Sequence, residues 1–413
     1  MSEKDFLIYS AKEPMVILRK KFNQGESLYK STPDSISQIA ALEDSAYVRF
    51  VLEEAYSGYD FYDKALFDTA FEAIECELRG GSKNVQINDL IDLIANNLSF
   101  INDGHLCLGT ENHGKGFYER LDTYVSDILL TENNGSYIDI TSGEKVELNG
   151  DNRLFQTISD KTSSAFLVGK RSKKPLDKIK LLIGGNERVL DVHKIKSKQR
   201  SEKILITDDY DTDVAYITCP SFIGDSEEDF NKFEEIGIRC RNYKNIILDL
   251  SNNLGGNSEF PKRFLKGLNG GFNDTTAICE LKSTLVHAKE CGEIKSIPRH
   301  LKNSSDQDMS FIPVYEGTLH IIINDRVASS AENAIIMAQS LKNVLFYGCN
   351  SMGIGRFGDL CIYYLPNSQV TLWCPQKIFE SIIEETVGFE PDFWVDSYDV
   401  TSIIKNHIKR QLV

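Results

Sequence analysis

Leu319-His-Ile-Ile-Ile-Asn-Asp-Arg-Val-Ala-Ser-Ser-Ala-Glu-Asn-Ala-Ile-Ile-Met-Ala-Gln-Ser-Leu341 predicts a strand, a turn and a helix in succession. A β-branched run and a polar turn lead into apolar residues at helical spacing. Ser329 and Ser330 fall where the helix begins, beside unpaired N–H groups and the positive end of its dipole. An oxyanion formed next to Ser329 would be stabilised there. The alternative is that one of these serines is an N-cap, the commoner role of serine before a helix, with Glu332 supporting the first turn.

A second strand and turn lie upstream. Residues 246–250 read Ile-Ile-Leu-Asp-Leu, which is typical of a buried parallel strand, and Ser251-Asn-Asn-Leu-Gly-Gly256 follows before a helix expected from about residue 259. Glycine lets backbone N–H groups approach a ligand closely. The segment is therefore either a plain strand-to-helix turn or half of an oxyanion hole. It is not a nucleotide phosphate loop, because no Gly-Lys-Ser/Thr follows.

The composition is that of a folded chain of two or three domains. The chain has 413 residues, of which 41% are hydrophobic and 26% charged. With 61 acidic and 46 basic residues the net charge is −15, which disfavours nucleic acid and anionic membranes as partners.

The sequence offers no sign of export, membrane insertion or metal binding. The N-terminus lacks an apolar core and a cleavage site, and no window of 18 residues is uncharged and apolar, so we expect a cytoplasmic protein. Nine cysteines occur without a Cys-x-x-Cys pair, which predicts neither a disulfide framework nor a zinc site.

The periodicity changes along the chain and predicts three domains. Residues 1–116 form a helical domain, with helices at 36–56, 61–78 and 87–98, that ends in a tight turn at Asp103-Gly104 followed by His105. Residues 117–208 alternate in short runs typical of a β-rich domain. Residues 209–413 form an α/β core. The polar segment 270–313 within it is typical of a lid or substrate wall.

Two motifs in this order resemble those of the C-terminal processing (tail-specific) serine peptidase family: Val327-Ala-Ser-Ser-Ala-Glu332 and the glycine segment that ends at Gly256. The resemblance implies a crotonase-like α/β core, in which Ser329 attacks a peptide carbonyl. It assigns the oxyanion hole to the N–H of Gly255 or Gly256 together with that of Ser330. The family often carries a PDZ-like domain in the middle of the chain, but no Gly-Leu-Gly-Phe-type loop supports one here, so a plain β insert is equally compatible.

The resemblance also names a base and its partner. Some branches of the family, including the tricorn core protease, place an Asp-Gly-His here whose histidine is the general base, and His105 matches it. A serine hydroxyl needs such a base at neutral pH. The bacterial branch uses a lysine instead, but the matching position is Ile354, which cannot accept a proton. Glu385 matches the glutamate that completes the set, with Glu384 as the second choice. A surface carboxylate is the alternative for either.

The resulting hypothesis is a serine endopeptidase acting through Ser329, His105 and Glu385 and an acyl-enzyme, with a protein or peptide as substrate. It requires no metal or organic cofactor, and it leaves a homo-oligomer open. The first rival is a catalytically inactive peptide- or ligand-binding protein on the same scaffold. The second is an acyl-CoA hydratase-like enzyme, which would not need this serine.

Overall fold

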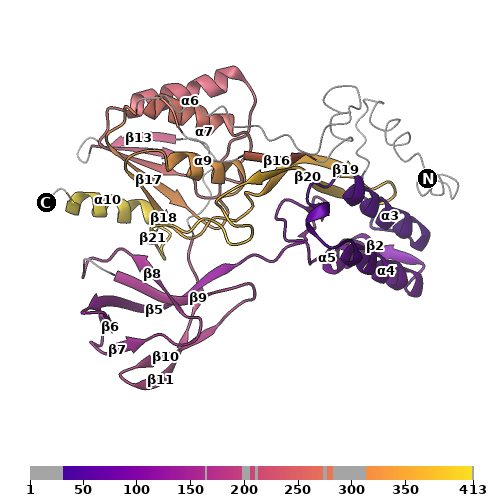
Figure 1. Ribbon diagram of the computed structural model, residues 1–413, viewed down its shortest axis with the longest axis horizontal. Coiled ribbons are helices and arrows are strands. Elements are labelled where there is room, and N and C mark those ends of the chain that lie inside the picture. The colour runs from indigo at the N-terminus through magenta and orange to yellow at the C-terminus, as the bar shows by residue number, and fades with distance from the viewer. Residues whose placement is uncertain are drawn as a thin grey trace. The chain divides into compact units, whose positions relative to one another are not determined.

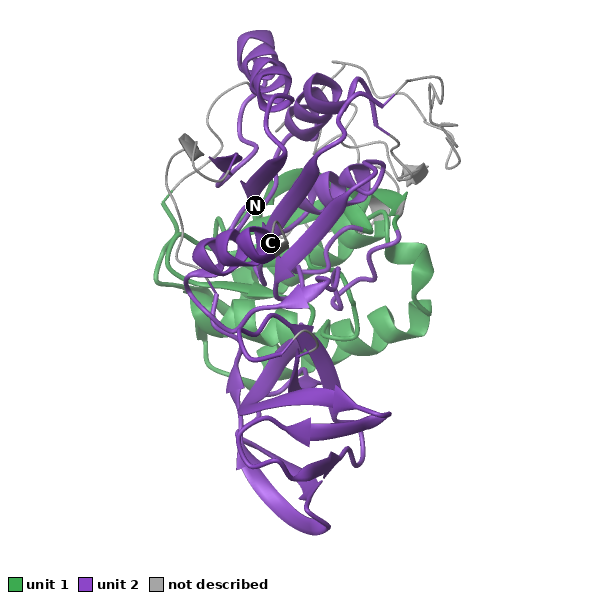
Figure 2. Cartoon of the chain, turned by 90° about the vertical axis from the view of Figure 1, so that its left-hand side faces the viewer, with its two compact units in different colours: residues 1–119, 276–304, 356–381 green, residues 120–275, 305–355, 382–413 purple. Residues whose placement is uncertain are grey.

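The computed structural model describes residues 31–162, 165–197, 205–209, 213–272, 277–281 and 313–411. Much of the predicted lid segment, at 273–276 and 282–312, lies outside these ranges. The chain divides into two compact units: residues 1–119, 276–304 and 356–381 form unit 1, and residues 120–275, 305–355 and 382–413 form unit 2 (Figure 2). Unit 1 therefore combines the start of the chain with two later segments.

Three amphipathic helices form one layer of unit 1 (Figure 1). The predicted helices at 36–56, 61–78 and 87–98 are confirmed, with ends shifted by at most three residues. Their apolar faces share one core with alternate residues of a strand pair in the same unit, including Tyr363 and Leu372. The helices are α3 (Gln38–Ala55), α4 (Lys64–Gly80) and α5 (Ile87–Asn97), with a 3₁₀ turn at Tyr59–Phe61 and a two-stranded ribbon of β1 (Ser35–Ser37) and β2 (Asn84–Gln86).

A small sheet forms the other layer of unit 1. Its order is β16-β20-β3-β4, with β19 also paired to β20, so strands from after residue 270 join strands from before residue 120. Local sequence pattern does not predict the pairing of β3 with β20, because these strands lie more than 250 residues apart. The strands are β3 (Cys107–Gly109), β4 (Gly114–Gly116), β16 (Ala277–Leu281), β19 (Phe357–Tyr364) and β20 (Thr371–Glu380).

Unit 2 begins with the predicted β-rich segment, which we call the middle β domain (residues 120–197). Its strands pair antiparallel in the order β11-β10-β7-β6-β5-β9-β8, and β12 also pairs with β5. Turns with positive φ at Gly135, Gly143 and Gly184 join successive strands. The strands are β5 (Asp122–Asn133), β6 (Ser136–Asp139), β7 (Lys145–Glu147), β8 (Arg153–Thr157), β9 (Ala165–Ser172), β10 (Lys178–Ile183), β11 (Asn186–Asp191) and β12 (His193–Lys194).

The rest of unit 2 is an α/β layer structure. Its sheet has the order β13-β14-β15-β17-β18-β21; β13 is antiparallel and the other strands are parallel. The predicted buried strands and the helices after them are confirmed. The strands are β13 (Leu205–Asp209), β14 (Val214–Thr218), β15 (Asn245–Asp249), β17 (Thr318–Ile323), β18 (Val344–Gly348) and β21 (Phe393–Trp394), and the helices are α6 (Glu227–Cys240), α7 (Glu259–Asn269), α9 (Ser330–Ala338) and α10 (Val400–Gln411).

Both faces of this sheet are covered, which explains its continuously apolar strands. Ile246 and Leu248 pack with α6, α7 and α9, whereas Ile247 between them packs with α10 on the other face. Strands β15 and β17 are parallel neighbours, so the loops after them leave the same edge of the sheet. Such edges are where open α/β sheets bind ligands.

In the described ranges, no helix has the length and apolar character of a membrane span.

Candidate functional site

Ser329 stands between β17 and α9 in a backbone conformation that L-residues seldom adopt. Its φ is 54° and its ψ −122°. Ser329 is the N-cap of α9 and forms a capping box with Glu332, as the alternative interpretation expected. Two other N-cap serines of the chain, Ser37 and Ser226, have ordinary φ of −66° and −85°. A non-glycine residue in such a region costs about 1–3 kcal/mol and persists where the surroundings impose it. A simple capping role does not require this strain.

The glycine segment packs directly on the turn at residues 324–330, which we call the nucleophile turn because Ser329 is its candidate nucleophile. Gly255 and Gly256 have φ of 90° and 130°. A Cβ added to Gly255 would lie 2.7 Å from the Ala328 carbonyl oxygen and 3.0 Å from the Ser329 Cβ. The Ala328 N–H donates to the Asn253 carbonyl at 3.0 Å. The absence of a side chain at residue 255 therefore lets the two loops meet.

The expected oxyanion donors differ in availability. The Gly255 N–H already donates to Asn253 Oδ1 at 2.8 Å. The Phe222 N–H donates to the Gly255 carbonyl at 3.0 Å, and because a peptide is planar and trans, this bond turns the Gly256 N–H to the opposite side. Within the described residues, neither the Gly256 N–H nor the Ser330 N–H at the start of α9 donates a hydrogen bond. These two groups are the candidate donors.

Glu332 holds the nucleophile turn from inside the protein. Its side chain is fully buried, and its Oε2 accepts the N–H groups of Ser329 at 3.3 Å and Ile354 at 2.9 Å. Its Oε1 accepts the Ser351 hydroxyl and the Gly353 N–H, at 2.5 and 2.8 Å. Burial raises the pKa of Glu332 and these four donors lower it. The sequence indicated only support of the first helical turn, whereas the carboxylate joins that turn to the loop at 351–354.

The loop of Glu385 is attached to the same support. The Thr386 N–H donates to the Gly353 carbonyl at 2.6 Å, and the Phe389 N–H donates to the Ser351 hydroxyl at 2.7 Å. Glu385 is buried, with 7% of its surface exposed, whereas Glu384 is exposed. Of the two carboxylates, Glu385 is the one that the fold holds inside.

The middle β domain also binds this loop. Arg171 on β9 forms an ion pair with Glu390 at 2.7 Å, and its guanidinium donates to the Val387 carbonyl. The side chain of Arg171 is only 4% exposed. The Leu121 N–H donates to the Thr386 carbonyl at 3.1 Å. The Glu385 loop is thus held on two sides, by the core and by the middle β domain.

His105 lies in unit 1, whereas Ser329, Ser330, Gly255, Gly256 and Glu385 lie in unit 2. Asp103 Oδ1 accepts the N–H groups of His105 and Leu106 at 2.8 and 3.3 Å, which fixes the predicted turn. The imidazole is 9% exposed, and its buried Nδ1 has no hydrogen-bond partner among the described residues. Burial lowers the pKa of His105 to about 4, so the ring is neutral at pH 7.

Other candidate bases are engaged elsewhere. His320 on β17 is buried and contacts the Tyr347 hydroxyl at 3.0 Å and Asn245 Oδ1 at 3.2 Å, so it is a packed strand residue. Ile354 is buried and apolar. Lys377 lies in unit 1, where it forms an ion pair with Asp359. Within the described ranges, no three His, Cys, Asp or Glu side chains gather as a metal site would require.

Comparison with known proteins bears on this arrangement. Residues 213–370 match peptidase family S41. This match makes the chain a serine-type peptidase. The matched segment covers less than half of the chain, so the similarity to family S41 is a property of that segment. The matched residues include Ser329, Ser330, Gly255 and Gly256 and leave His105 and Glu385 outside.

Solved structures resemble the chain at low identity. Mature CPAF is 14% identical, with 91% of this chain and 97% of that one covered and a TM-score of 0.49. The photosystem II D1 C-terminal processing protease is 14% identical, with 89% and 96% covered and a TM-score of 0.39. The tricorn protease is 15% identical, with 91% of this chain but 37% of that one covered and a TM-score of 0.46. No curated protein matches the sequence.

The first prediction concerns Glu332. In Glu332→Gln, the amide NH₂ faces N–H donors that the carboxylate oxygen had accepted, so we expect a loss of unfolding free energy of about 3 kcal/mol. Chemical denaturation followed by circular dichroism measures it. Glu384→Gln, at the exposed carboxylate, is the control and should leave the midpoint unchanged. A midpoint in Glu332→Gln equal to that of the parent would show that the turn does not depend on this carboxylate.

The second prediction concerns His105. Between its folded pKa of about 4 and its ordinary value of 6.5, the folded chain binds fewer protons at this site than the unfolded chain. The contribution of His105 is therefore complete above pH 6.5 and is lost as the pH falls toward 4. In urea titrations from pH 7.5 to 4.5, the parent should lose stability relative to His105→Gln. Burial raises the pKa of Asp103, which acts in the opposite sense, but Asp103 is present in both proteins. Parallel curves would contradict the prediction.

Proposed function

We propose that this chain is a serine endopeptidase with a crotonase-like α/β core that cleaves protein or peptide substrates through Ser329, His105 and Glu385. The observation that carries the proposal is the strained backbone of Ser329 at the mouth of α9, beside two N–H groups that donate no hydrogen bond in the described part of the chain. Strain at a serine in this setting has a chemical use, because it presents the hydroxyl outside the helix next to an oxyanion site.

The reaction proceeds through an acyl-enzyme. Ser329 Oγ attacks the peptide carbonyl carbon while His105 takes the hydroxyl proton, and the N–H groups of Gly256 and Ser330 bind the oxyanion. The C–N bond then breaks, and His105 gives its proton to the leaving amine. Water, deprotonated by His105, then attacks the ester carbonyl carbon, the bond to Ser329 Oγ breaks, and His105 returns the proton to Oγ as the acid is released. Each step uses the same base and the same donors.

Three features support His105 as the base. It is neutral at pH 7, because burial lowers its pKa. Its Nδ1 is buried without a partner among the described residues, and a carboxylate that accepted a hydrogen bond from Nδ1–H would fix the tautomer with Nε2 facing the serine. The lysine of other branches has no counterpart at Ile354, which is buried and apolar. Glu385 is proposed as the carboxylate, since it is buried and Glu384 is exposed.

The proposed base and nucleophile belong to different units. The proposed triad therefore takes its base from one unit and its nucleophile from the other.

An inactive peptide- or ligand-binding protein on the same scaffold is the weaker candidate. A binding protein has no physical need for a serine at φ 54° or for a histidine with a buried, unpartnered ring nitrogen. An acyl-CoA hydratase-like enzyme likewise has no use for the nucleophile. The family match also speaks for a peptidase.

The third prediction tests the nucleophile and the base. Ser329→Ala and His105→Ala should each lower peptide hydrolysis by about a thousandfold or more and abolish labelling by a fluorophosphonate probe, because the serine is then missing or not activated. Ser340→Ala, which removes a hydroxyl bonded to Met337 O at the far end of α9, is the control and should label like the parent. Equal labelling of the parent and Ser329→Ala would refute the assignment.

The fourth prediction separates the two glutamates. Glu385→Gln keeps the size of the side chain but removes the charge that stabilises the imidazolium, so kcat should fall by about a hundredfold or more with little change in KM. Glu384→Gln should retain the parent rate. The measurement is steady-state hydrolysis of a peptide substrate selected from a library. The opposite ranking would transfer the role to Glu384.

A further inference from the structure

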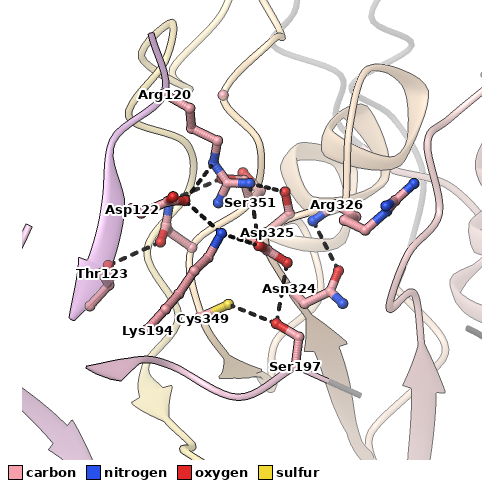
Figure 3. A network of polar contacts seen from close by, with 12 residues as sticks. Arg120, Asp122, Thr123, Lys194, Ser197, Asn324, Asp325, Arg326, Cys349 and Ser351 are labelled. Carbon is pink, nitrogen blue, oxygen red and sulfur yellow. Dashed lines mark hydrogen bonds and ion pairs between the residues drawn. The ribbon is translucent and has the colours of Figure 1, made fainter. Parts of the chain in front are cut away.

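Asp325 is a partly buried carboxylate in the nucleophile turn, four residues before Ser329. Its side chain is 15% exposed. Both ion pairs that it forms within the described residues come from the middle β domain, as Figure 3 shows: Lys194 Nζ lies 2.9 Å and Arg120 Nη1 3.7 Å from its Oδ2. Ser197, which follows β12, donates its hydroxyl to Asp325 Oδ1 at 3.2 Å.

The charges in this cluster depend on one another. Burial alone would raise the pKa of Asp325, but Arg120 and Lys194 bring it below its ordinary value. The same lysine lies 3.0 Å from Asp122 at the start of β5. Removing one cation leaves a largely buried carboxylate short of positive charge, which is costly unless the turn moves. The middle β domain therefore influences the position of Asp325.

A displacement of Asp325 reaches Ser329 because the turn between them is stiff. Asn324 Oδ1 accepts the N–H groups of Arg326 at 3.1 Å and of Asn252 in the glycine segment at 2.9 Å. The Val327 N–H donates to the Asn324 carbonyl at 2.9 Å, and the Met352 N–H donates to the Val327 carbonyl at 2.8 Å. These hydrogen bonds restrict the conformational freedom of the backbone between Asp325 and Ser329.

We propose that Asp325, Lys194 and Arg120 are positioning residues, through which the middle β domain sets the conformation of the nucleophile turn. The inference rests on the proposed function in taking Ser329 as the nucleophile. On this basis, the middle β domain contributes to catalysis by fixing the nucleophile turn. The cluster touches no reacting atom, so its effect falls on kcat and on the reactivity of Ser329 more than on KM.

The fifth prediction uses two lysines of one segment. Lys194→Ala should lower kcat and the rate of fluorophosphonate labelling by about tenfold with KM unchanged, since small displacements of a nucleophile slow attack strongly. Lys194→Arg should restore most of the rate. Lys196 pairs with Asp396 at 3.6 Å and not with Asp325. Lys196→Ala therefore removes a comparable ion pair of the same segment, and its kcat and labelling rate should stay within twofold of the parent. Equal losses in the two alanine variants would overturn the proposal.

A double-mutant cycle and hydrogen exchange complete the test. In the double variant Lys194→Ala/Asp325→Asn, the loss of kcat, expressed as free energy of activation, should be smaller than the sum of the losses in the two single variants, because an uncharged amide no longer requires the cation. Additive losses would contradict the proposal. Exchange at residues 324–330 should rise in Lys194→Ala and not in Lys196→Ala, and unchanged exchange would also overturn it. Exchange does not depend on hydrolysis. An unlabelled parent would refute the proposed function, while exchange would still decide whether the cluster holds the turn.

Discussion

The arrangement of unit 2 depends on one buried carboxylate. Glu332 accepts four hydrogen bonds, three from backbone N–H groups and one from a hydroxyl. One of them comes from the N–H of Ser329 itself. The carboxylate therefore helps to stabilise a backbone conformation of Ser329 that is energetically unfavourable for an L-residue. The other three donors lie at residues 351–354, the loop on which the Glu385 segment rests. One side chain thus supports both Ser329, the proposed nucleophile, and the loop on which its proposed partner Glu385 rests.

Asparagine side chains complete the same constraint at the sheet edge. Asn253 accepts the N–H of Gly255 on its side chain and that of Ala328 on its carbonyl, and Asn324 accepts the N–H of Asn252. Loops that leave neighbouring parallel strands β15 and β17 are therefore tied to each other as well as to their strands. Buried hydrogen bonds of this kind favour a single arrangement of the two loops. A hole for an oxyanion needs this property, because donors that reorient during the reaction lose much of their stabilising effect.

Local pattern was enough to predict the helices, the buried strands and the strand-turn-helix of Ser329. It succeeded because β15 and β17 are apolar on both faces and α3, α4 and α5 carry continuous apolar stripes. It failed for the sheet of unit 1, where β20 pairs with β3 from the other end of the chain, since no local signal specifies so distant a partner. The ties made by Asn253, Asn324 and Arg171 were missed for the same reason. Their distant partners, among them the backbone groups of Ala328, Asn252 and Val387, are brought near only by the fold.

The two halves of the proposed site are prepared to different degrees. In unit 2, the strained serine, the glycine segment and the Glu385 loop are held by hydrogen bonds internal to that unit. In unit 1, His105 is neutral and its Nδ1 lacks a partner among the described residues, an arrangement that a buried ring nitrogen tolerates poorly. A serine hydroxyl without its base is a weak nucleophile at neutral pH. On the proposed mechanism, the strained serine and the glycine segment are therefore preorganised within unit 2 by its own hydrogen bonds, whereas the proposed base is a neutral imidazole of unit 1.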